Sequence, residues 1–196
     1  MACCTFPTCW YVINGNVGGS AEVRERVDEA KRLSFERLVA PLRDDLFRYA
    51  TWLCRDPVLA DDVVQETMIR AFKAIDKLED EASVKIWLLT ITRREHARVY
   101  ERKRLETKDI EDLTHAESAL IGVGHDTDLD DMRRAILELE DDYREPLVLQ
   151  VLMGLTTEEI AETMGINRGA VLTRLHRARK KLIESVQASL AVVERQ

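Results

Sequence analysis

A stretch of basic side chains near the middle of the chain has the spacing needed to bind a phosphate backbone. Residues 85–104 hold seven bases and two acids, a net charge of +5. Arg94, Arg98 and Arg102 follow one another four residues apart, so they line one stripe of a helix. Such a stripe can follow the phosphates of nucleic acid, and Tyr100 beside it could stack on an exposed base. By itself the stripe is weak evidence, because helix ends are often basic for reasons of the helix dipole.

A second basic stretch, residues 168–181, holds six bases and no acid and lies in the pattern of a helix-turn-helix. Thr156 and Glu159 form a capping-box pattern at the start of a short helix, and Gly165 marks its end. Asn167 can cap the next helix. The apolar positions of that helix, at spacings of four, three and four residues, are Val171, Leu175, Ala178 and Leu182. The positions outside this apolar stripe are Arg168, Gly169, Ala170, Thr173, Arg174 and Arg177.

In a helix-turn-helix the second helix lies in the major groove, with its N-terminal side chains at the base edges. The acid-free charge of residues 168–181 favours DNA contact over the alternative, a solvated cationic face on an ordinary helical hairpin.

The elements that must hold these residues are helices, since apolar residues recur every three or four positions almost everywhere from residue 21 onward. The predicted helices span residues 33–53, 58–78, about 86–97, 132–139, 144–153, 157–164 and 168–186. Asp56-Pro57 separates the first two, because the residue before a proline avoids the helical conformation. No segment has a strand pattern, and the predicted fold class is all-α.

Between residues 105 and 131 the character of the sequence changes, with nine acids, a single base and weak periodicity. We expect a flexible acidic linker here, with a fragment of helix at about residues 115–121. The chain then consists of two small helical domains joined by this linker, of which the C-terminal one carries the helix-turn-helix. The predicted divisions are a flexible N-terminal extension over 1–30, a first domain over 31–105, the linker over 106–128 and a second domain over 129–190.

The overall charge is −7, from 36 acidic and 29 basic side chains. This acidity would speak against a nucleic-acid binder, but a net charge does not say where the charges lie. Apolar runs fall short of the ~18–20 residues that span a bilayer, and no basic region precedes an apolar stretch at the N-terminus. Neither membrane insertion nor a secretory signal is therefore expected.

Three of the four cysteines, Cys3, Cys4 and Cys9, stand close to the N-terminus. They lack paired CxxC spacing and a nearby histidine, so a flexible tail is favoured over a metal or redox site. Cys54 is expected to be a small buried side chain. No metal site and no cofactor are predicted.

The second predicted helix carries a polar face formed by Asp61, Asp62, Gln65 and Glu66. Their spacing indicates no catalytic geometry. This face is either solvated surface or a docking face for a partner helix.

Together these motifs resemble the extracytoplasmic-function (ECF) sigma factors of bacterial RNA polymerase. The segment 59–67, LADDVVQET, is similar to the most telling signature of that family, and Trp87-Leu88 follows it at the usual distance. Residues 137–182 resemble the family's promoter-reading C-terminal domain. The resemblance covers residues 35–104 and 129–185.

The resemblance implies a sigma factor, which is not an enzyme and which directs core polymerase in the cytoplasm to promoters. The polar face would bind the clamp helices of the largest polymerase subunit, through Asp61, Asp62, Gln65, Glu66 and Arg70. The first basic helix would bind the −10 element of promoter DNA, through Arg93, Arg94, Arg98, Tyr100 and Arg102. The helix-turn-helix would bind the −35 element, through Thr157, Arg168, Gly169, Ala170, Thr173, Arg174, Arg177, Lys180 and Lys181. An anti-sigma factor, often membrane-anchored in this family, would control the protein in a stress or signal response.

Several residues depart from the family pattern. Arg94 stands where the family usually has Asn, Arg98 where Asp is common, and Val84 where Phe is usual. Ala170 replaces a common Thr and Leu172 a common Lys, so base preferences cannot be carried over from relatives. Glu140 replaces a frequent Pro, a change to which we assign little functional weight.

Two other functions are consistent with parts of the pattern. A stand-alone helix-turn-helix regulator would bind operator DNA without polymerase, and a helical adaptor would bind only protein. Two separate basic faces and an acidic tether favour the sigma factor, because a simple regulator needs one DNA-reading module.

Overall fold

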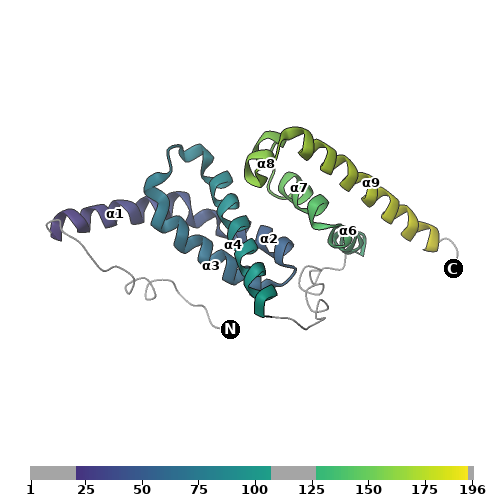
Figure 1. Ribbon diagram of the computed structural model, residues 1–196, viewed down its shortest axis with the longest axis horizontal. Coiled ribbons are helices and arrows are strands. Elements are labelled where there is room, and N and C mark those ends of the chain that lie inside the picture. Colours follow the sequence, from purple (N-terminus) through teal and green to yellow (C-terminus); the bar gives the residue numbers. More distant parts are fainter. Residues whose placement is uncertain (1–20, 107–126, 194–196) are drawn as a thin grey trace.

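The computed structural model describes residues 21–106 and 127–193, which are helices and short connections (Figure 1). An N-terminal unit comprises α1 (Ala21–Leu38), α2 (Arg43–Cys54), α3 (Pro57–Ala74) and α4 (Val84–Glu106). A C-terminal unit comprises α6 (Thr127–Glu138), α7 (Asp141–Val151), α8 (Thr157–Met164) and α9 (Arg168–Val193). Three short 3-10 helices, Ala40–Leu42, Ile75–Lys77 and Glu81–Ser83, complete the N-terminal unit. The prediction of an all-α protein with two helical domains is confirmed.

The first predicted helix, over residues 33–53, was wrong as a single element. The chain leaves α1 at Leu38, makes a 3-10 turn that contains Pro41, and starts α2 at Arg43. Proline lacks the amide hydrogen that an uninterrupted helix would use, so the turn divides the predicted helix. The expected domain boundary at residue 30 also falls inside α1, which is helical from Ala21.

Local signals account for the other helix starts and stops of the N-terminal unit. Arg55 has a left-handed backbone, with φ of 55°, and ends α2. Asp56 then caps α3, because its side chain accepts hydrogen bonds from the amides of Val58 and Leu59. Pro57 occupies the first helical position, where a missing amide costs nothing.

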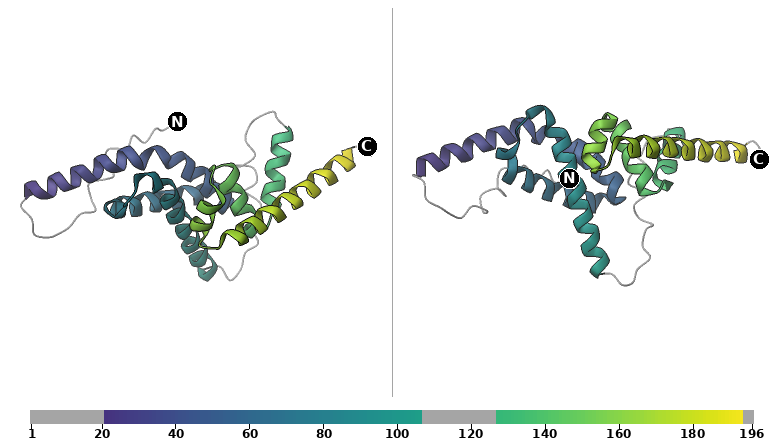
Figure 2. Two further views of the ribbon diagram at one scale, coloured as in Figure 1. Left: turned by 90° about the horizontal axis from the view of Figure 1, so that it is seen from above. Right: turned by 45° about the horizontal axis from the view of Figure 1, so that its top comes forward.

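The two units are in contact. Helix α4 packs on α8, and α2 packs on α7. Buried apolar residues form one cluster that includes Tyr49 and Leu89 of the first unit and Leu149 and Ile160 of the second. Helices α1 and α9 extend away from this contact in opposite directions (Figure 2).

Some predictions fall on parts of the chain that this description does not reach. Cys3, Cys4 and Cys9 lie outside the described residues, as do most of the predicted linker and its helical fragment at residues 115–121. Cys54 is half-buried rather than fully buried. Over the described residues, no helix is long and apolar enough to span a membrane.

Candidate DNA- and polymerase-binding faces

Helix α4 exposes most of the predicted −10 residues. Arg94, Arg98, Tyr100 and Arg102 are exposed along its second half. Tyr100 is 63 % exposed, and its ring lies beside that of His96, with the two centroids 6.1 Å apart. The exposed part of the ring is where a base could stack. Arg93 differs from the others, because its Nε donates to Glu145 Oε1 of α7 at 2.8 Å. Three arginines and a tyrosine therefore form an exposed surface, and the fifth residue, Arg93, is held by the other unit.

A chain of ion pairs joins the predicted polymerase-binding residues to this basic helix. Glu66 of α3 pairs with Arg70 at 2.9 Å, and Arg70 Nε lies 2.8 Å from Glu95 Oε1 of α4. The same carboxylate accepts from Arg98 at 2.6 Å. Glu95 is 3 % exposed, so its buried carboxylate depends on the two guanidinium groups for its counter-charge. The faces predicted from α3 and α4 thus meet along one ridge of the N-terminal unit.

The remaining acids of the α3 face differ in their availability. Asp61 accepts from Arg43 of α2 at 2.9 Å and from Gln65 at 2.6 Å, so it helps to join α2 to α3. Asp62 is exposed and has no ion pair with any residue that the structure describes. The structure therefore offers Asp62 as the more accessible anionic contact.

The helix-turn-helix of α8 and α9 forms through local hydrogen bonds. The amide of Thr156 donates to Glu159 Oε2 at 2.7 Å, and the Glu159 amide donates to Thr156 Oγ1 at 3.3 Å, which completes the predicted capping box. Gly165 ends α8 with φ of 66°, a conformation that favours glycine. Asn167 Oδ1 then accepts from the amide of Ala170 at 2.8 Å, at the start of α9.

Packing sets the face that α9 presents to solvent. Val171, Leu175 and Ala178 are buried against the unit's core, as the spacing predicts, while Leu182 is half-buried. The predicted outward positions are exposed apart from Ala170 and Arg174, which are half-buried.

Several of the predicted −35 residues already have acidic partners within the chain. Arg168 pairs with Glu158 of α8 at 2.7 Å, and Lys180 pairs with Glu184 at 3.8 Å. Arg174 lies 3.2 Å from Asp142 of α7. Lys181 donates to Glu140, which precedes α7, at 2.5 Å, and this contact raises the pKa of Lys181 above its usual value.

The acids at the start of α7 are the functional candidates that sequence reasoning missed. Glu140, Asp142 and Glu145 each contact a predicted DNA-binding base. The dense acidic run 138–142 was a signal in the sequence, but nothing local indicated its partners, which lie in distant helices.

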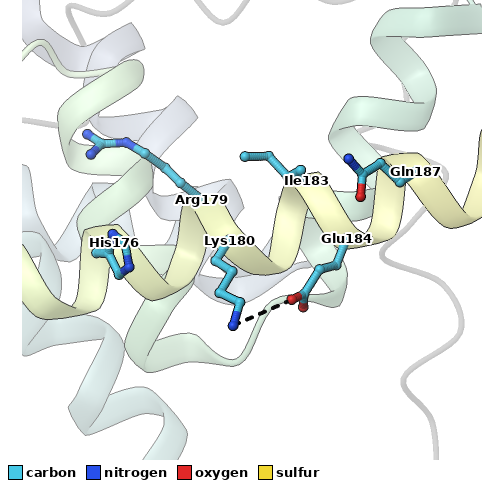
Figure 3. Close-up of a pocket in the computed structure, with 6 residues that line it drawn as sticks. All are labelled: His176, Arg179, Lys180, Ile183, Glu184 and Gln187. Atoms are coloured by element: carbon cyan, nitrogen blue, oxygen red, sulfur yellow. Dashed lines mark ion pairs between the residues drawn. The ribbon is translucent and has the colours of Figure 1, made fainter.

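A shallow depression lies on the surface of α9. The side chains in Figure 3, from His176 to Gln187, line an open surface depression and all belong to this one helix. Among the described residues, no group of three or more histidine, cysteine, aspartate or glutamate side chains could hold a metal ion.

The fold and these faces define a class: a two-unit helical protein with a helix-turn-helix in one unit and a separate basic helix in the other. Comparisons with known proteins agree. The family described as Sigma-70 region 2 matches residues 38–106, and Sigma-70, region 4 matches residues 129–182. The match to region 2 beside region 4 favours a sigma factor over a stand-alone helix-turn-helix regulator.

Individual relatives fall within the same family. The chain is 32 % identical over 154 residues to the ECF RNA polymerase sigma factor EcfG of Rhodopseudomonas palustris, over 74 % of this chain and 84 % of that protein. It is 28 % identical over 179 residues to the ECF sigma factor SigE of Mycolicibacterium smegmatis, over 88 % of this chain and 69 % of that one. The chain therefore belongs to the ECF RNA polymerase sigma factors.

Solved structures show the same fold. The sigma factor RpoE of Bartonella quintana, in a co-crystal structure with the anti-sigma factor NepR, has a TM-score of 0.64 and 26 % identity, over 78 % of this chain and 96 % of that one. CnrH, in complex with the cytosolic domain of CnrY, has a TM-score of 0.59 and 24 % identity, over 85 % of this chain and 96 % of that one. The protein is an RNA polymerase sigma factor, a factor of transcription initiation.

Proposed function

We propose that each of the faces described above binds a different target. Helix α4 binds the −10 element through Arg93, Arg94, Arg98, Tyr100 and Arg102. Helices α8 and α9 bind the −35 element, and the α3 face with Asp62 at its centre binds the clamp helices of the largest polymerase subunit. The observation that carries the proposal is the placement of two basic helices, α4 and α9, on two separate helical units.

The chemistry of promoter opening fits this division. An exposed tyrosine beside exposed arginines is suited to a separated strand, since bases stack on the ring and phosphates meet the cations. A capped helix-turn-helix is suited to duplex DNA, because its second helix lies in the major groove with its first residues at the base edges. The protein thus uses its binding energy to position the polymerase on promoter DNA. The polymerase makes the phosphodiester bonds, so the protein itself is not an enzyme. It acts in the cytoplasm.

An anti-sigma factor is the proposed regulator. Its support is the likeness to the sigma factor RpoE, which was crystallised with the anti-sigma factor NepR. A protein that covers the α3 face or either basic helix would compete with polymerase or with DNA.

Run-off transcription tests the proposed function. The purified chain, added to core polymerase, should start transcripts at defined positions on a subset of genomic promoter fragments. A library that yields no specific transcript would contradict the proposal.

A pair of variants tests the α3 face separately. We expect D62K to weaken binding to core polymerase at least about tenfold, because like charges brought together across an interface cost several kcal/mol. E79K makes the same charge change at an exposed residue outside α3 and serves as the control. Equal binding of both variants would remove Asp62 from the interface.

A further inference from the structure

Helix α9 exposes a leucine that the predicted set of −35 residues does not include. Leu172 is 48 % exposed, whereas Val171 before it and Leu175 after it are buried. The core of the C-terminal unit thus takes up the two flanking apolar residues and leaves Leu172 outside. A single exposed leucine is ordinary on a protein surface, so its meaning depends on where it lies.

Leu172 lies in the second turn of α9, within the part of a recognition helix that meets the base edges. Residues three or four positions apart share one side of a helix. On this side, Arg168 and Gly169 come one turn before Leu172 and His176 comes one turn after it, and all three are exposed. The leucine therefore shares the side of α9 on which the first predicted −35 residues lie.

Gly169 leaves open surface next to Leu172. A Cβ atom at Gly169 would meet only the Oδ1 of Asn167, the cap of α9, at 3.3 Å. A helical side chain leans toward the preceding turn, so the Leu172 side chain extends toward this bare position. The missing side chain lets a base edge come close to the helix and reach the leucine.

Thr173 adds a methyl group beside the leucine. Its Oγ1 donates to the carbonyl oxygen of Gly169 at 2.9 Å, so the hydroxyl hydrogen is used within the helix. The exposed side chain then offers DNA its methyl group and an acceptor oxygen. We call Leu172 and Thr173 the apolar front of α9.

The chemistry of the major groove selects one ligand for this front. The apolar group that distinguishes the bases there is the 5-methyl of thymine. The other distinguishing groups are hydrogen-bond donors and acceptors, which leucine cannot satisfy and would deprive of water. Contact between the leucine and a thymine methyl removes both apolar surfaces from water, so thymine is the base that the front favours.

The cations near the apolar front supply affinity of another kind. Arg168, Arg177 and Lys180 are exposed, and such side chains commonly meet phosphates, which carry no sequence information. Arg168 is also paired with Glu158 of α8 at 2.7 Å. The apolar front therefore adds a discrimination between bases that phosphate contacts do not provide.

We propose that Leu172 packs against the 5-methyl group of a thymine in the −35 element and so helps to determine which promoters are chosen. The Thr173 methyl supplies a smaller contact of the same kind. The proposal rests on the −35-binding role proposed above for α8 and α9.

A pool of random duplex DNA supplies the probe. The full chain selects duplexes from the pool, alone and with core polymerase, and the most enriched duplex is then made with each thymine replaced in turn by deoxyuridine. Deoxyuridine lacks the 5-methyl group and keeps the other edge groups of thymine. We expect one or two of these replacements to weaken binding about fourfold, the effect of losing the burial of one methyl group.

The variant L172A tests whether the leucine makes this contact. Alanine is a strong helix former, so the variant should keep the fold of α9. We expect L172A to bind the thymine probe about fourfold more weakly and no longer to distinguish it from the deoxyuridine probe. I183A is the matched control, because Ile183 is an apolar residue of the same helix that is 57 % exposed and lies farther from its start (Figure 3).

A second variant, L172K, provides an independent measurement. Lysine replaces the apolar contact with a cation that can meet a phosphate, so binding should depend more steeply on salt. The discrimination between thymine and deoxyuridine should be lost, as in L172A. If folded L172A and L172K still distinguish the two probes as the unmodified chain does, the leucine does not read the methyl group and the proposal is wrong.

The remaining results separate this contact from the proposed function. A pool that yields no enriched duplex, or an enriched duplex that no deoxyuridine replacement weakens, overturns the thymine contact. A failure of the proposed function appears elsewhere, as run-off reactions without specific transcripts from the unmodified chain and core polymerase. Loss of methyl discrimination in L172A and L172K, with full discrimination in I183A, supports the contact.

Discussion

Arg174 illustrates how a residue can be exposed to DNA and still be held by its own protein. It is half-buried at the start of α9 and lies 3.2 Å from Asp142. We expect R174A to weaken binding to duplex −35 DNA by about 1–3 kcal/mol if the guanidinium reads a base edge. R179A is the control, since Arg179 on the same helix bonds to Gln150 instead. Fluorescence anisotropy measures the affinity for cognate and scrambled duplexes. An equal loss of affinity for both would show that Arg174 contacts a phosphate and not a base.

Arg144 has a structural role that its charge does not suggest. It is 3 % exposed and donates to the carbonyl oxygens of Leu137 and Leu139 at 3.4 and 3.1 Å, at the end of α6. R144M would leave these two buried carbonyls without their donor, so we expect a loss of about 3 kcal/mol in the free energy of unfolding. Urea denaturation measures this change in the free energy of unfolding. R134M, which removes an exposed pair with Asp131, should cost less than about 1 kcal/mol, and similar losses in the two variants would contradict the capping role.

His96 makes stability depend on pH. Burial lowers its pKa below the usual 6.5, and the nearby Arg144 and Arg93 lower it further against the opposing effect of Asp141. The folded state then binds fewer protons than the unfolded state, so stability should fall as pH drops below about 6.5. Urea denaturation between pH 5 and 8 should show a smaller decline for H96Q than for the exposed-site control H176Q. Parallel curves for the two variants would exclude His96 as the cause.

At the scale of elements, the capping box of α8 fixes the start of the helix-turn-helix. T156A removes a hydroxyl that accepts from the Glu159 amide, and we expect it to cost about 1 kcal/mol in the free energy of unfolding. Thermal denaturation is the measurement, and T157A is the neighbouring control because Thr157 bonds only to the exposed Glu158. If T157A cost as much as T156A, the box would not be the source of the effect.

The sequence predicted a helix correctly where the residues that start and stop it lie within a few positions of each other. Helix α8 has the predicted bounds of 157–164, because the cap at Thr156 and the stop at Gly165 both act within a few residues. The break at Pro41 was missed because the apolar periodicity continues through it. The apolar stripe of α9 was predicted for the same reason as α8, since its spacing is visible in a short window.

The contacts between units had no such local signal. Glu145 and Arg93 are separated by 52 residues, and Glu145 and Tyr49 by 96. In the sequence, Glu95 counts only as an acid that lowers the net charge of residues 85–104. In the structure it is buried between Arg70 and Arg98. The sequence thus predicted which residues share a face of a helix. It could not predict which acids contact them, because those acids lie on distant helices. Glu140, assigned little functional weight from sequence, contacts Lys181.

At the scale of the whole molecule, none of the residues proposed to bind DNA or polymerase belongs to the first twenty. We expect a chain lacking residues 1–20 to select the same promoters as the full chain, because α1 starts at Ala21 and both basic helices follow it. Sequencing of RNA 5′ ends made by each form with core polymerase provides the comparison. Lost or altered start sites, or a metal ion lost with the truncated segment, would contradict the expectation of a flexible tail.

The apolar cluster that runs from α2 and α4 into α7 and α8 makes the contact between the two units depend on temperature. Parting the units exposes apolar surface to water, and such exposure carries a positive change in heat capacity. Because the hydrophobic contribution weakens on cooling, the contact between the two units should weaken in the cold and tighten on moderate warming. Hydration of this buried cluster, and not only the ion pairs around it, therefore sets how firmly the two units are held together.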